Sequence, residues 1–300
     1  MWWMPYIAPR FWPLWTCFAA LWVVTRLPFG AQMGVGSLIG AIAFRLARRR
    51  RHIASVNLQL CFPDTAAHER ARLLRAHFDA LGRGVVETAL CWWGRTAALQ
   101  RHAVVIGLEH LQAARSRGKG VILLSAHFTT LELGGRLLAS RAPFHVLYRP
   151  HRNPLFETVM QRARQRRFGR AIERNDSRGL LASLRAGMPV WYAPDQNHAG
   201  PQAAFVPFFG VPASTLTATS RLARLSGAAV VPFFPLRLPG REGYLLVLCP
   251  ALQAFPSDAA EHDAARVNRM IEAVVRELPE QYLWVHRRFK TRPRGQAPPY

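Results

Sequence analysis

Lysine and acidic residues are scarce in this sequence. Its 300 residues include 40 lysines and arginines against 17 aspartates and glutamates, which gives a formal net charge of +23. The only lysines are Lys119 and Lys290, so the basic charge is almost entirely arginine. This balance predicts acidic partners, such as nucleic acid, an anionic membrane, a phosphorylated substrate or an acidic carrier protein. The planar fork of arginine suits both phosphate and carboxylate groups.

Cysteine is also scarce, and its spacing argues against several kinds of site. Cys17, Cys61, Cys91 and Cys249 form no CxxC pair and have no metal-ligand spacing, which predicts buried free thiols in a reducing compartment. The sequence has no HExxH motif and no clustered His/Asp pattern that would indicate zinc. Ser125 lies in the context LLSAH, without the glycine-flanked turn of a hydrolase nucleophile. We therefore expect no metal and no other cofactor.

The N-terminal region lacks an uninterrupted apolar run of the ~20 residues that a membrane-spanning helix needs. Residues 11–24 carry no charge but are too few, and a second, glycine-rich apolar stretch covers 27–44. A secretory signal would need a basic start and a small-residue cleavage site. The arginines at 48–51 favour a cytoplasmic location for the rest of the chain. We predict a membrane anchor over residues 1–30; the alternative is a helical hairpin that lies on the membrane without crossing it.

Internal repeats are absent, and the character of the sequence changes at about residue 100. Residues 31–100 look helical and form a predicted membrane-proximal region. Beyond them, predicted strands cover 103–106, 121–125, 144–148, 190–193, 230–235 and 244–248. Predicted helices cover 108–117, 130–140, 154–167, 179–186, 215–225 and 262–277. This alternation predicts an α/β domain over 101–300, with a mixed, largely parallel sheet sandwiched by helices.

The stretch LLSAHFTTLELGGRLL, residues 123–138, places His127 just after a predicted strand. Active sites of parallel α/β sheets lie beyond the carboxyl ends of the strands. Glu132, in the first turn of the next helix, would hold one ring nitrogen of His127, and the other would take a proton from a substrate hydroxyl. In the alternative, Thr129 and Glu132 form a capping box at the helix start. The two interpretations are compatible, because Glu132 has two carboxylate oxygens.

The pattern His127-x4-Glu132 resembles that of the glycerolipid acyltransferase superfamily. Nearly the whole chain resembles the lauroyl-type late acyltransferases of lipid A biosynthesis in Gram-negative bacteria, through HFTTLELGGR, NLQLCFPD (57–64), YRPHRNPLFE (148–157), LRAGMPVWYAPDQ (184–196), AFVPFFGVPASTLT (204–217), LARLSGAAVVPF (222–233) and PEQYLWVHRRFKTRP (279–293). The resemblance implies a glycerol-phosphate acyltransferase-like fold at the cytoplasmic face of the inner membrane. It also implies transfer of an acyl chain, with lauroyl (C12) favoured, from acyl carrier protein to a hydroxyl on a Kdo2-lipid IVA-type glycolipid. A myristoyl- or palmitoleoyl-specific relative, or a transferase for another glycolipid, is the alternative.

The resemblance also implies the residues of the site. His127 would be the general base and Glu132 its orienting partner, and the acceptor hydroxyl would attack the donor thioester directly. Arg164 aligns best with a family arginine, although the register also fits its neighbours Arg162, Arg166 and Arg167. Asp195, in APDQ, matches another family position near the active site. Tyr148 and Arg149 begin the YRP segment and are expected to bind substrate.

Two further features have open interpretations. The basic run at 286–292, HRRFKTR, mixes aromatic and cationic side chains that suit nucleic acid or a solvated face. The resemblance instead favours contact with acceptor phosphates or the carrier protein, or a structural role beside the sheet, and it implies no nucleic-acid partner. A non-catalytic basic protein of membrane surfaces or nucleic acid is the distant alternative. Four other residues either line an acyl pocket or belong to the core: Phe205, Phe208, Phe209 and Leu216.

Overall fold

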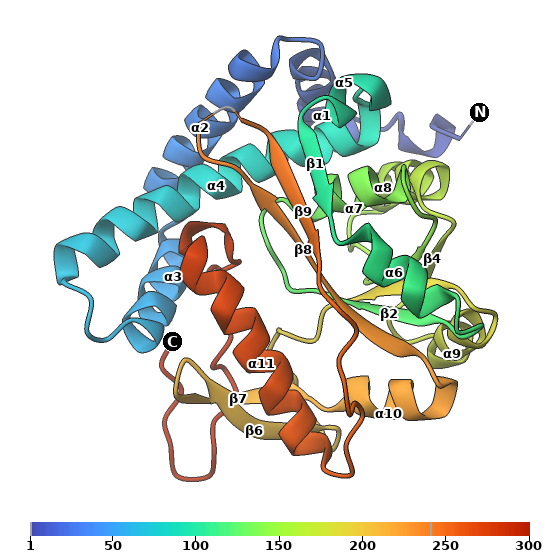
Figure 1. The fold of residues 1–300 in the computed structure, drawn as a ribbon. Helices are drawn as coiled ribbons and strands as arrows, with labels where there is room; N and C mark the ends of the chain where they lie inside the picture. Colours follow the sequence, from blue (N-terminus) through green and yellow to red (C-terminus); the bar gives the residue numbers. More distant parts are fainter. Residues whose placement is uncertain (1, 241) are drawn as a thin grey trace.

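The computed structural model describes residues 2–240 and 242–300 (Figure 1). The first hundred residues form η1 (Met4–Tyr6), η2 (Pro9–Phe11), α1 (Trp12–Val24), α2 (Phe29–Leu46), α3 (Arg48–Cys61), α4 (Ala67–Trp93) and α5 (Thr96–Gln100). The strands that follow are β1 (Ala103–Ile106), β2 (Val121–Leu124), β3 (His145–Tyr148), β4 (Arg170–Glu173), β5 (Pro189–Tyr192), β6 (Ala203–Phe208), β7 (Val211–Leu216), β8 (Ala229–Arg237) and β9 (Tyr244–Leu248). The helices between and after them are α6 (Leu108–Arg115), α7 (Leu131–Ala139), α8 (Pro154–Arg167), α9 (Ser177–Arg185), α10 (Ala218–Ser226), α11 (Ala260–Glu277) and η3 (Pro279–Gln281).

A seven-stranded sheet organises the part of the chain after residue 100. Its strand order is β1-β9-β8-β2-β5-β3-β4. Neighbouring strands run parallel, except β8 and β9, which pair antiparallel. Strands β6 and β7 form a separate hairpin. The predicted mixed, largely parallel α/β fold is confirmed.

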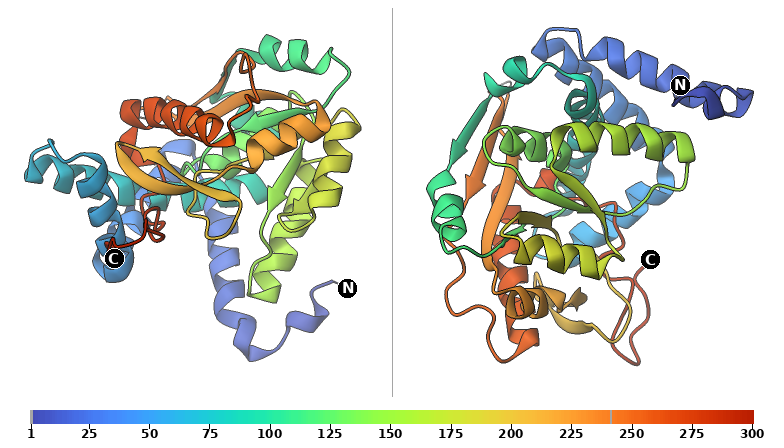
Figure 2. Two further views of the ribbon diagram at one scale, coloured as in Figure 1. Left: turned by 90° about the horizontal axis from the view of Figure 1, so that it is seen from below. Right: turned by 90° about the vertical axis from the view of Figure 1, so that its right-hand side faces the viewer.

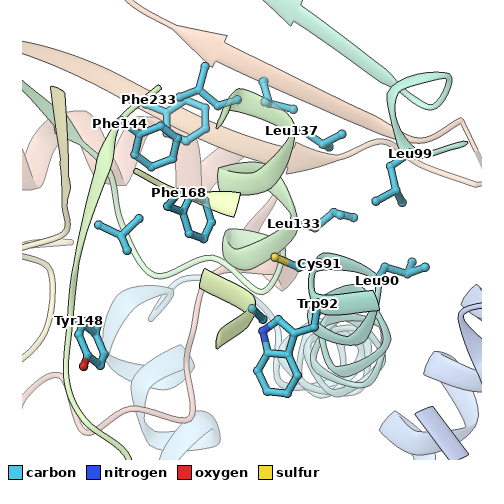
Figure 3. Close-up of a cluster of buried hydrophobic side chains, with 14 of the residues drawn as sticks. Leu90, Cys91, Trp92, Leu99, Leu133, Leu137, Phe144, Tyr148, Phe168 and Phe233 are labelled. Carbon is cyan, nitrogen blue, oxygen red and sulfur yellow. The ribbon is translucent and has the colours of Figure 1, made fainter. Parts of the chain in front are cut away.

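The core lies on both faces of this sheet. Successive side chains of a strand point to opposite faces, so Val121 and Leu123 of β2 pack with α6, α7 and α8. Ile122 and Leu124 pack on the other side with α9, α10 and α11. Figure 3 shows part of the first cluster, including Leu137 of α7 and Phe233 of β8. Every residue of β2 is buried, which explains why this central strand has a continuous apolar sequence rather than an alternating one.

The six predicted strands and six predicted helices all form, most of them within two residues of the predicted ends. The sequence analysis missed β4, whose sequence RAIE is charged at both ends because it lies at the edge of the sheet. It also missed β6 and β7, because Pro207 and Pro212 argue against strands. In the hairpin these prolines face each other, and the two-residue turn uses positive φ at Phe209 and Gly210, as type I′ hairpin turns require.

The N-terminal helices lie at one side of the sandwich (Figure 2). Exposed large hydrophobic residues there include Trp2, Trp3, Trp12, Trp22, Leu38, Ile42 and Leu46. Among the described residues, the helix that is long and apolar enough to cross a membrane is α2, which begins at the end of the predicted anchor at 1–30 and continues to Leu46. Helix α1 has 13 residues, too few to span. Its Cys17 is exposed and Cys249 is only partly buried, contrary to the prediction of buried thiols, whereas Cys61 and Cys91 are buried.

Helix α2 packs directly on the backbone of α4. A Cβ atom on Gly82 would lie 2.1 Å from the carbonyl oxygen of Gly36 and 2.3 Å from the nitrogen of Gly40. Contacts this short leave no room for a side chain, so all three glycines are needed for the helices to approach so closely. Helix α4 therefore connects the apolar N-terminal helices to the α/β sandwich.

Candidate functional site

Two loops meet at the carboxyl end of the sheet. One follows β2 and holds His127; the other follows β5 and holds Asp195. Strands β2 and β5 are neighbours in parallel register, with Leu124 opposite Tyr192. Because parallel strands end at the same edge, residues far apart in the sequence converge there. The predicted position of His127 after a strand is confirmed.

His127 and Asp195 form a doubly bonded pair. The ring nitrogen Nδ1 of His127 lies 2.6 Å from Oδ1 of Asp195, and the backbone nitrogen of His127 donates to Oδ2 at 3.0 Å. Asp195 is 2% exposed, whereas the His127 side chain is 26% exposed. An ionised carboxylate only accepts hydrogen bonds, so Nδ1 carries the proton and Nε2 is the acceptor of the ring. The pair therefore offers a partly exposed basic nitrogen backed by a buried carboxylate.

The electrostatics of the pair support a general base. Burial alone would lower the pKa of His127, but the charge and hydrogen bond of Asp195 outweigh burial and raise this pKa above 6.5. Burial would raise the pKa of Asp195, but its bonds to His127 lower it to about 2. Asp195 is therefore ionised at neutral pH, where it stabilises the protonated imidazole that a general base becomes.

The predicted hydrogen bond between Glu132 and His127 is wrong, because Asp195 occupies Nδ1 of His127. Glu132 lies in the first turn of α7 and pairs instead with Arg164 of α8. The capping box is also not formed: α7 begins after Thr130, without a side-chain cap. The Thr129 hydroxyl lies 3.4 Å from the Arg237 guanidinium. Glu132 thus belongs to a second charged pair.

The substrate-binding candidates divide into one group near Glu132 and others apart from it. Arg164 pairs with Glu132 and lies 5.5 Å from the ring centroid of Tyr148. The Tyr148 hydroxyl accepts a hydrogen bond from Gln161 at 2.6 Å. In contrast, Arg149 is exposed on the following loop. Of the alternatives to Arg164, Arg162 stacks on Trp2 at 4.9 Å, away from this pair. Arg166 is exposed, and Arg167 is partly buried.

A cavity adjoins the Glu132–Arg164 pair. Apart from these two side chains its lining is mainly apolar: Leu131, Gly135, Phe144, Val146, Leu147, Phe168 and Trp191. The ring of Trp191 also lies edge-on to His127, with 6.1 Å between centroids. The four residues named earlier for an acyl pocket do not line this cavity. Phe208 and Phe209 are buried in the opposite core cluster, Leu216 packs against that cluster, and Phe205 is exposed.

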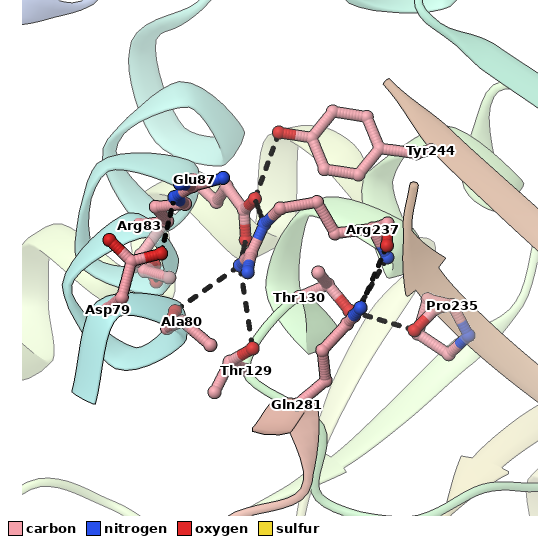
Figure 4. A network of polar contacts seen from close by, with 12 residues as sticks. Asp79, Ala80, Arg83, Glu87, Thr129, Thr130, Pro235, Arg237, Tyr244 and Gln281 are labelled. Carbon is pink, nitrogen blue, oxygen red and sulfur yellow. Dashed lines mark hydrogen bonds and ion pairs between the residues drawn. The ribbon is translucent and has the colours of Figure 1, made fainter. Parts of the chain in front are cut away.

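Within the basic C-terminal run, Arg288 has a structural role, whereas Lys290 is exposed. Arg288 is 1% exposed and donates to the Ser214 carbonyl at 2.8 Å and to the Thr215 hydroxyl at 2.7 Å. This result favours the structural role beside the sheet over a nucleic-acid surface. Nearby, Gln281 accepts from the Arg237 backbone nitrogen at 2.8 Å (Figure 4). Nothing in the sequence predicted that residues 281–283 bond to the backbone of the loop that holds His127.

We expect Asp195→Asn to move the acid limb of the kcat/KM–pH profile to lower pH. A general base works when deprotonated, so the rate falls as pH drops through the pKa of His127, which Asp195 holds above 6.5. Without that charge, burial lowers the pKa. The maximal rate should also fall by ~10²-fold or more, because general-base catalysis contributes ~10²–10⁴. A profile that keeps the wild-type limb would show that Asp195 does not act on His127.

Within the residues that the structure describes, no group of three or more His, Cys, Asp or Glu side chains is placed to hold a metal ion. The site combines a partly exposed histidine bonded to a buried carboxylate, a guanidinium–carboxylate pair and an apolar cavity beside that pair. Such an arrangement can deprotonate a hydroxyl and accommodate an apolar chain.

Comparisons with known proteins place the chain among acyltransferases. A family model described as bacterial lipid A biosynthesis acyltransferase matches residues 4–291. The lipid A biosynthesis lauroyltransferase of Escherichia coli (strain K12) is 39% identical over 288 residues, covering 96% of this chain and 94% of the relative. The palmitoleoyltransferase of the same organism is 39% identical, covering 98% and 96%. Its myristoyltransferase is 30% identical, covering 97% and 91%.

Among solved structures, the crystal structure of the 1-acyl-sn-glycerophosphate acyltransferase PlsC from Thermotoga maritima matches with 15% identity and a TM-score of 0.37. The match covers 78% of this chain and 98% of that chain. At this TM-score the likeness supports no functional inference.

Proposed function

This chain belongs to the bacterial lipid A biosynthesis acyltransferases, and on that premise we propose that it transfers a lauroyl (C12) chain from acyl carrier protein to a hydroxyl of a hydroxyacyl chain on a Kdo2-lipid IVA-type glycolipid. The whole-chain match to the lipid A acyltransferases carries this proposal. The lauroyl- and palmitoleoyltransferases are equally similar, at 39% identity, so palmitoleoyl is the alternative chain. The myristoyltransferase is more distant, at 30%.

In the proposed reaction, Nε2 of His127 removes the proton from the acceptor hydroxyl. The hydroxyl oxygen attacks the carbonyl carbon of the thioester, and the electrons of the C=O double bond move onto the carbonyl oxygen to form a tetrahedral intermediate. Collapse of this intermediate forms the ester and breaks the C–S bond, and the departing thiolate takes the proton from protonated His127. Asp195 holds the ring in the required tautomer and stabilises its charge. This role for Asp195 is supported by its bond of 2.6 Å to Nδ1.

We propose that the Arg164 guanidinium stabilises the negative charge that develops on the carbonyl oxygen of the thioester. A preorganised cationic donor near a developing oxyanion is among the largest contributions to catalysis. Arg164 is mostly buried, with 15% of its side chain exposed, and Glu132 fixes its guanidinium. Burial alone would lower the pKa of Arg164, but Glu132 raises it, so the cation persists. In this proposal Glu132 acts on Arg164 rather than on His127.

The cavity beside this pair is proposed to hold the acyl chain. Gly135 lines it, and a Cβ at this position would meet the Phe168 ring at 3.4 Å, in ordinary contact. We expect Gly135→Ala to lower the preference for C12 over C10 donors by ~10-fold, because one methylene is worth about 1–3 kcal/mol of discrimination. Competing the two donors in one reaction measures the ratio.

The matched control is Gly34→Ala, because Gly34 is also helical and a Cβ there has nothing within 4 Å. It should keep the wild-type ratio. An unchanged ratio in Gly135→Ala would mean that the chain lies elsewhere.

The partners and location follow from charge and surface. A net charge of +23 suits an acidic carrier protein and an acceptor with phosphates and carboxylates. The exposed apolar residues of the N-terminal helices support attachment to the inner membrane, with Arg48 to Arg51 at its anionic cytoplasmic surface. We propose that residues 101–300 face the cytoplasm. Protease treatment of spheroplasts should then leave this part intact, and its digestion would contradict the orientation.

A donor competition tests the finer part of the proposal. The purified protein receives C10 to C16 chains, including palmitoleoyl, on both acyl carrier protein and coenzyme A, together with the glycolipid acceptor. We expect carrier-bound C12 to dominate the product. Equal use of the coenzyme A thioesters would contradict the carrier-protein donor, and a palmitoleoyl product would replace the lauroyl assignment.

A further inference from the structure

The segment 278–291, which we call the C-terminal strap, is hydrogen-bonded to both loops of the site. It bonds first to the His127 loop. The Leu283 backbone nitrogen donates to the His127 carbonyl at 3.0 Å, and the Thr129 nitrogen donates to the Gln281 carbonyl at 2.8 Å. Phe128 and Tyr282 form an antiparallel bridge between these bonds. The strap thus fixes the backbone on both sides of His127.

The strap also bonds to the Asp195 loop, through Asn197. The side chain of Asn197 donates to the Thr291 hydroxyl at 3.0 Å and accepts from the Thr291 backbone nitrogen at 2.9 Å. The backbone nitrogen of Asn197 donates to Nε2 of His286 at 3.2 Å. Three bonds therefore tie the strap to a residue two positions after Asp195.

His286 is suited to this contact because it is neutral. Burial lowers its pKa to about 4, so Nε2 keeps a lone pair for the Asn197 nitrogen at neutral pH. Its backbone is fixed as well: the His286 carbonyl accepts from the Asn57 side chain at 2.7 Å, and its nitrogen donates to the Leu283 carbonyl at 3.1 Å. Leu283 is the residue bonded to His127, so a short path of hydrogen bonds joins the two loops.

We propose that Asn197 and His286 are positioning residues, which set the Asp195 carboxylate against Nδ1 of His127. The inference rests on the proposed function of the His127–Asp195 pair. Neither residue needs to touch substrate. By bonding to both loops, the strap holds the loop of His127 at a fixed distance from the loop of Asp195. A misplacement of about 1 Å between catalytic groups can cost ~10²-fold in rate.

The test uses Asn197→Ala, which removes both side-chain bonds to Thr291, and His286→Ala, which removes the acceptor. His286→Gln is the rescue variant, because its amide oxygen can reach the place of Nε2. We expect kcat to fall by ~10²-fold in both alanine variants with KM nearly unchanged, and His286→Gln to recover most of the loss. The acid limb of the pH profile should move to lower pH, because a weaker hydrogen bond from His127 to Asp195 raises the pKa of His127 less.

Exposed Asn175→Ala and His262→Ala are matched controls that should behave as wild type. The pKa of His127, followed by NMR, gives a readout that needs no turnover: it should fall in Asn197→Ala. If the wild-type protein transfers no acyl chain, the proposed function fails, while this titration still tests the positioning. The inference would be overturned if Asn197→Ala kept both the kcat and the His127 pKa of the wild-type protein. It would also be overturned if His286→Gln failed to recover the activity lost in His286→Ala. Should His286→Ala fail to fold, the other two variants decide.

Discussion

Replacing His127 by alanine should lower kcat by about 10²–10⁴-fold, the usual contribution of a general base. The variant lacks the partly exposed imidazole, which is 26% exposed and is the base in this proposal. Substrate binding through the cavity and Arg164 should persist, so KM should change little. Initial rates of acyl transfer, measured with saturating acceptor, give both constants.

The fold must be shown to survive this change. Removing His127 leaves the Asp195 charge without its side-chain partner, so some loss of stability is expected, and thermal unfolding should be recorded alongside the rates. His127→Gln is a milder companion, since it keeps a donor for Asp195 but provides no base. Full activity in both folded variants would contradict the assignment of His127 as the base.

Replacing Arg237 by methionine should cost about 3–5 kcal/mol of stability, because it leaves a buried carboxylate uncompensated. Arg237 of β8 donates to Glu87 of α4 at 2.6 and 2.8 Å, and Tyr244 donates to the same carboxylate at 3.0 Å (Figure 4). Glu87 is 1% exposed. The midpoint of urea unfolding should fall with an unchanged m value.

The matched control removes both charges and the Tyr244 hydroxyl together. In Glu87→Leu/Arg237→Met/Tyr244→Phe no buried charge is left without its ion-pair partner, and apolar replacement of buried ion pairs is often neutral. The triple variant should therefore be more stable than Arg237→Met alone. If the single variant were as stable as wild type, the Glu87–Arg237 pair would not be what holds α4 to the sheet.

The strand and loop that carry His127 were predictable from sequence. Residues 121–124 form a continuous apolar run because β2 is buried on both faces, and the predicted strand ends within one residue of the observed one. The polar residues that follow mark the end of the strand. Local sequence therefore defined where the base would lie, since apolar patterning reports burial directly.

The partner of His127 was not predictable from local spacing. Glu132 is five residues away in the sequence, whereas Asp195 is 68 residues away. Their contact depends on β5 lying beside β2, and strand order is a long-range property that local patterns do not encode. Family resemblance pointed to Asp195 as a site residue but gave it no contact with His127.

The roles of the arginines were also hidden in the sequence. A high arginine content suggests a basic surface, yet Arg136, Arg237 and Arg288 are buried. Each donates to backbone carbonyls or to a buried carboxylate. Whether a charged side chain can be buried depends on the partners that the fold brings to it. The number of arginines and the basic run at 286–292 therefore did not reveal which arginines are structural and which can contact acidic partners.

The most direct test of this account is the mass of the lipid product. The purified protein in detergent is incubated with lauroyl-charged acyl carrier protein and a Kdo-bearing tetra-acylated lipid A precursor, and the lipids are analysed by mass spectrometry. We predict a gain of one lauroyl group, lost in His127→Ala. No gain with this donor or with any carrier-bound chain from C10 to C16 would contradict acyl transfer to this acceptor.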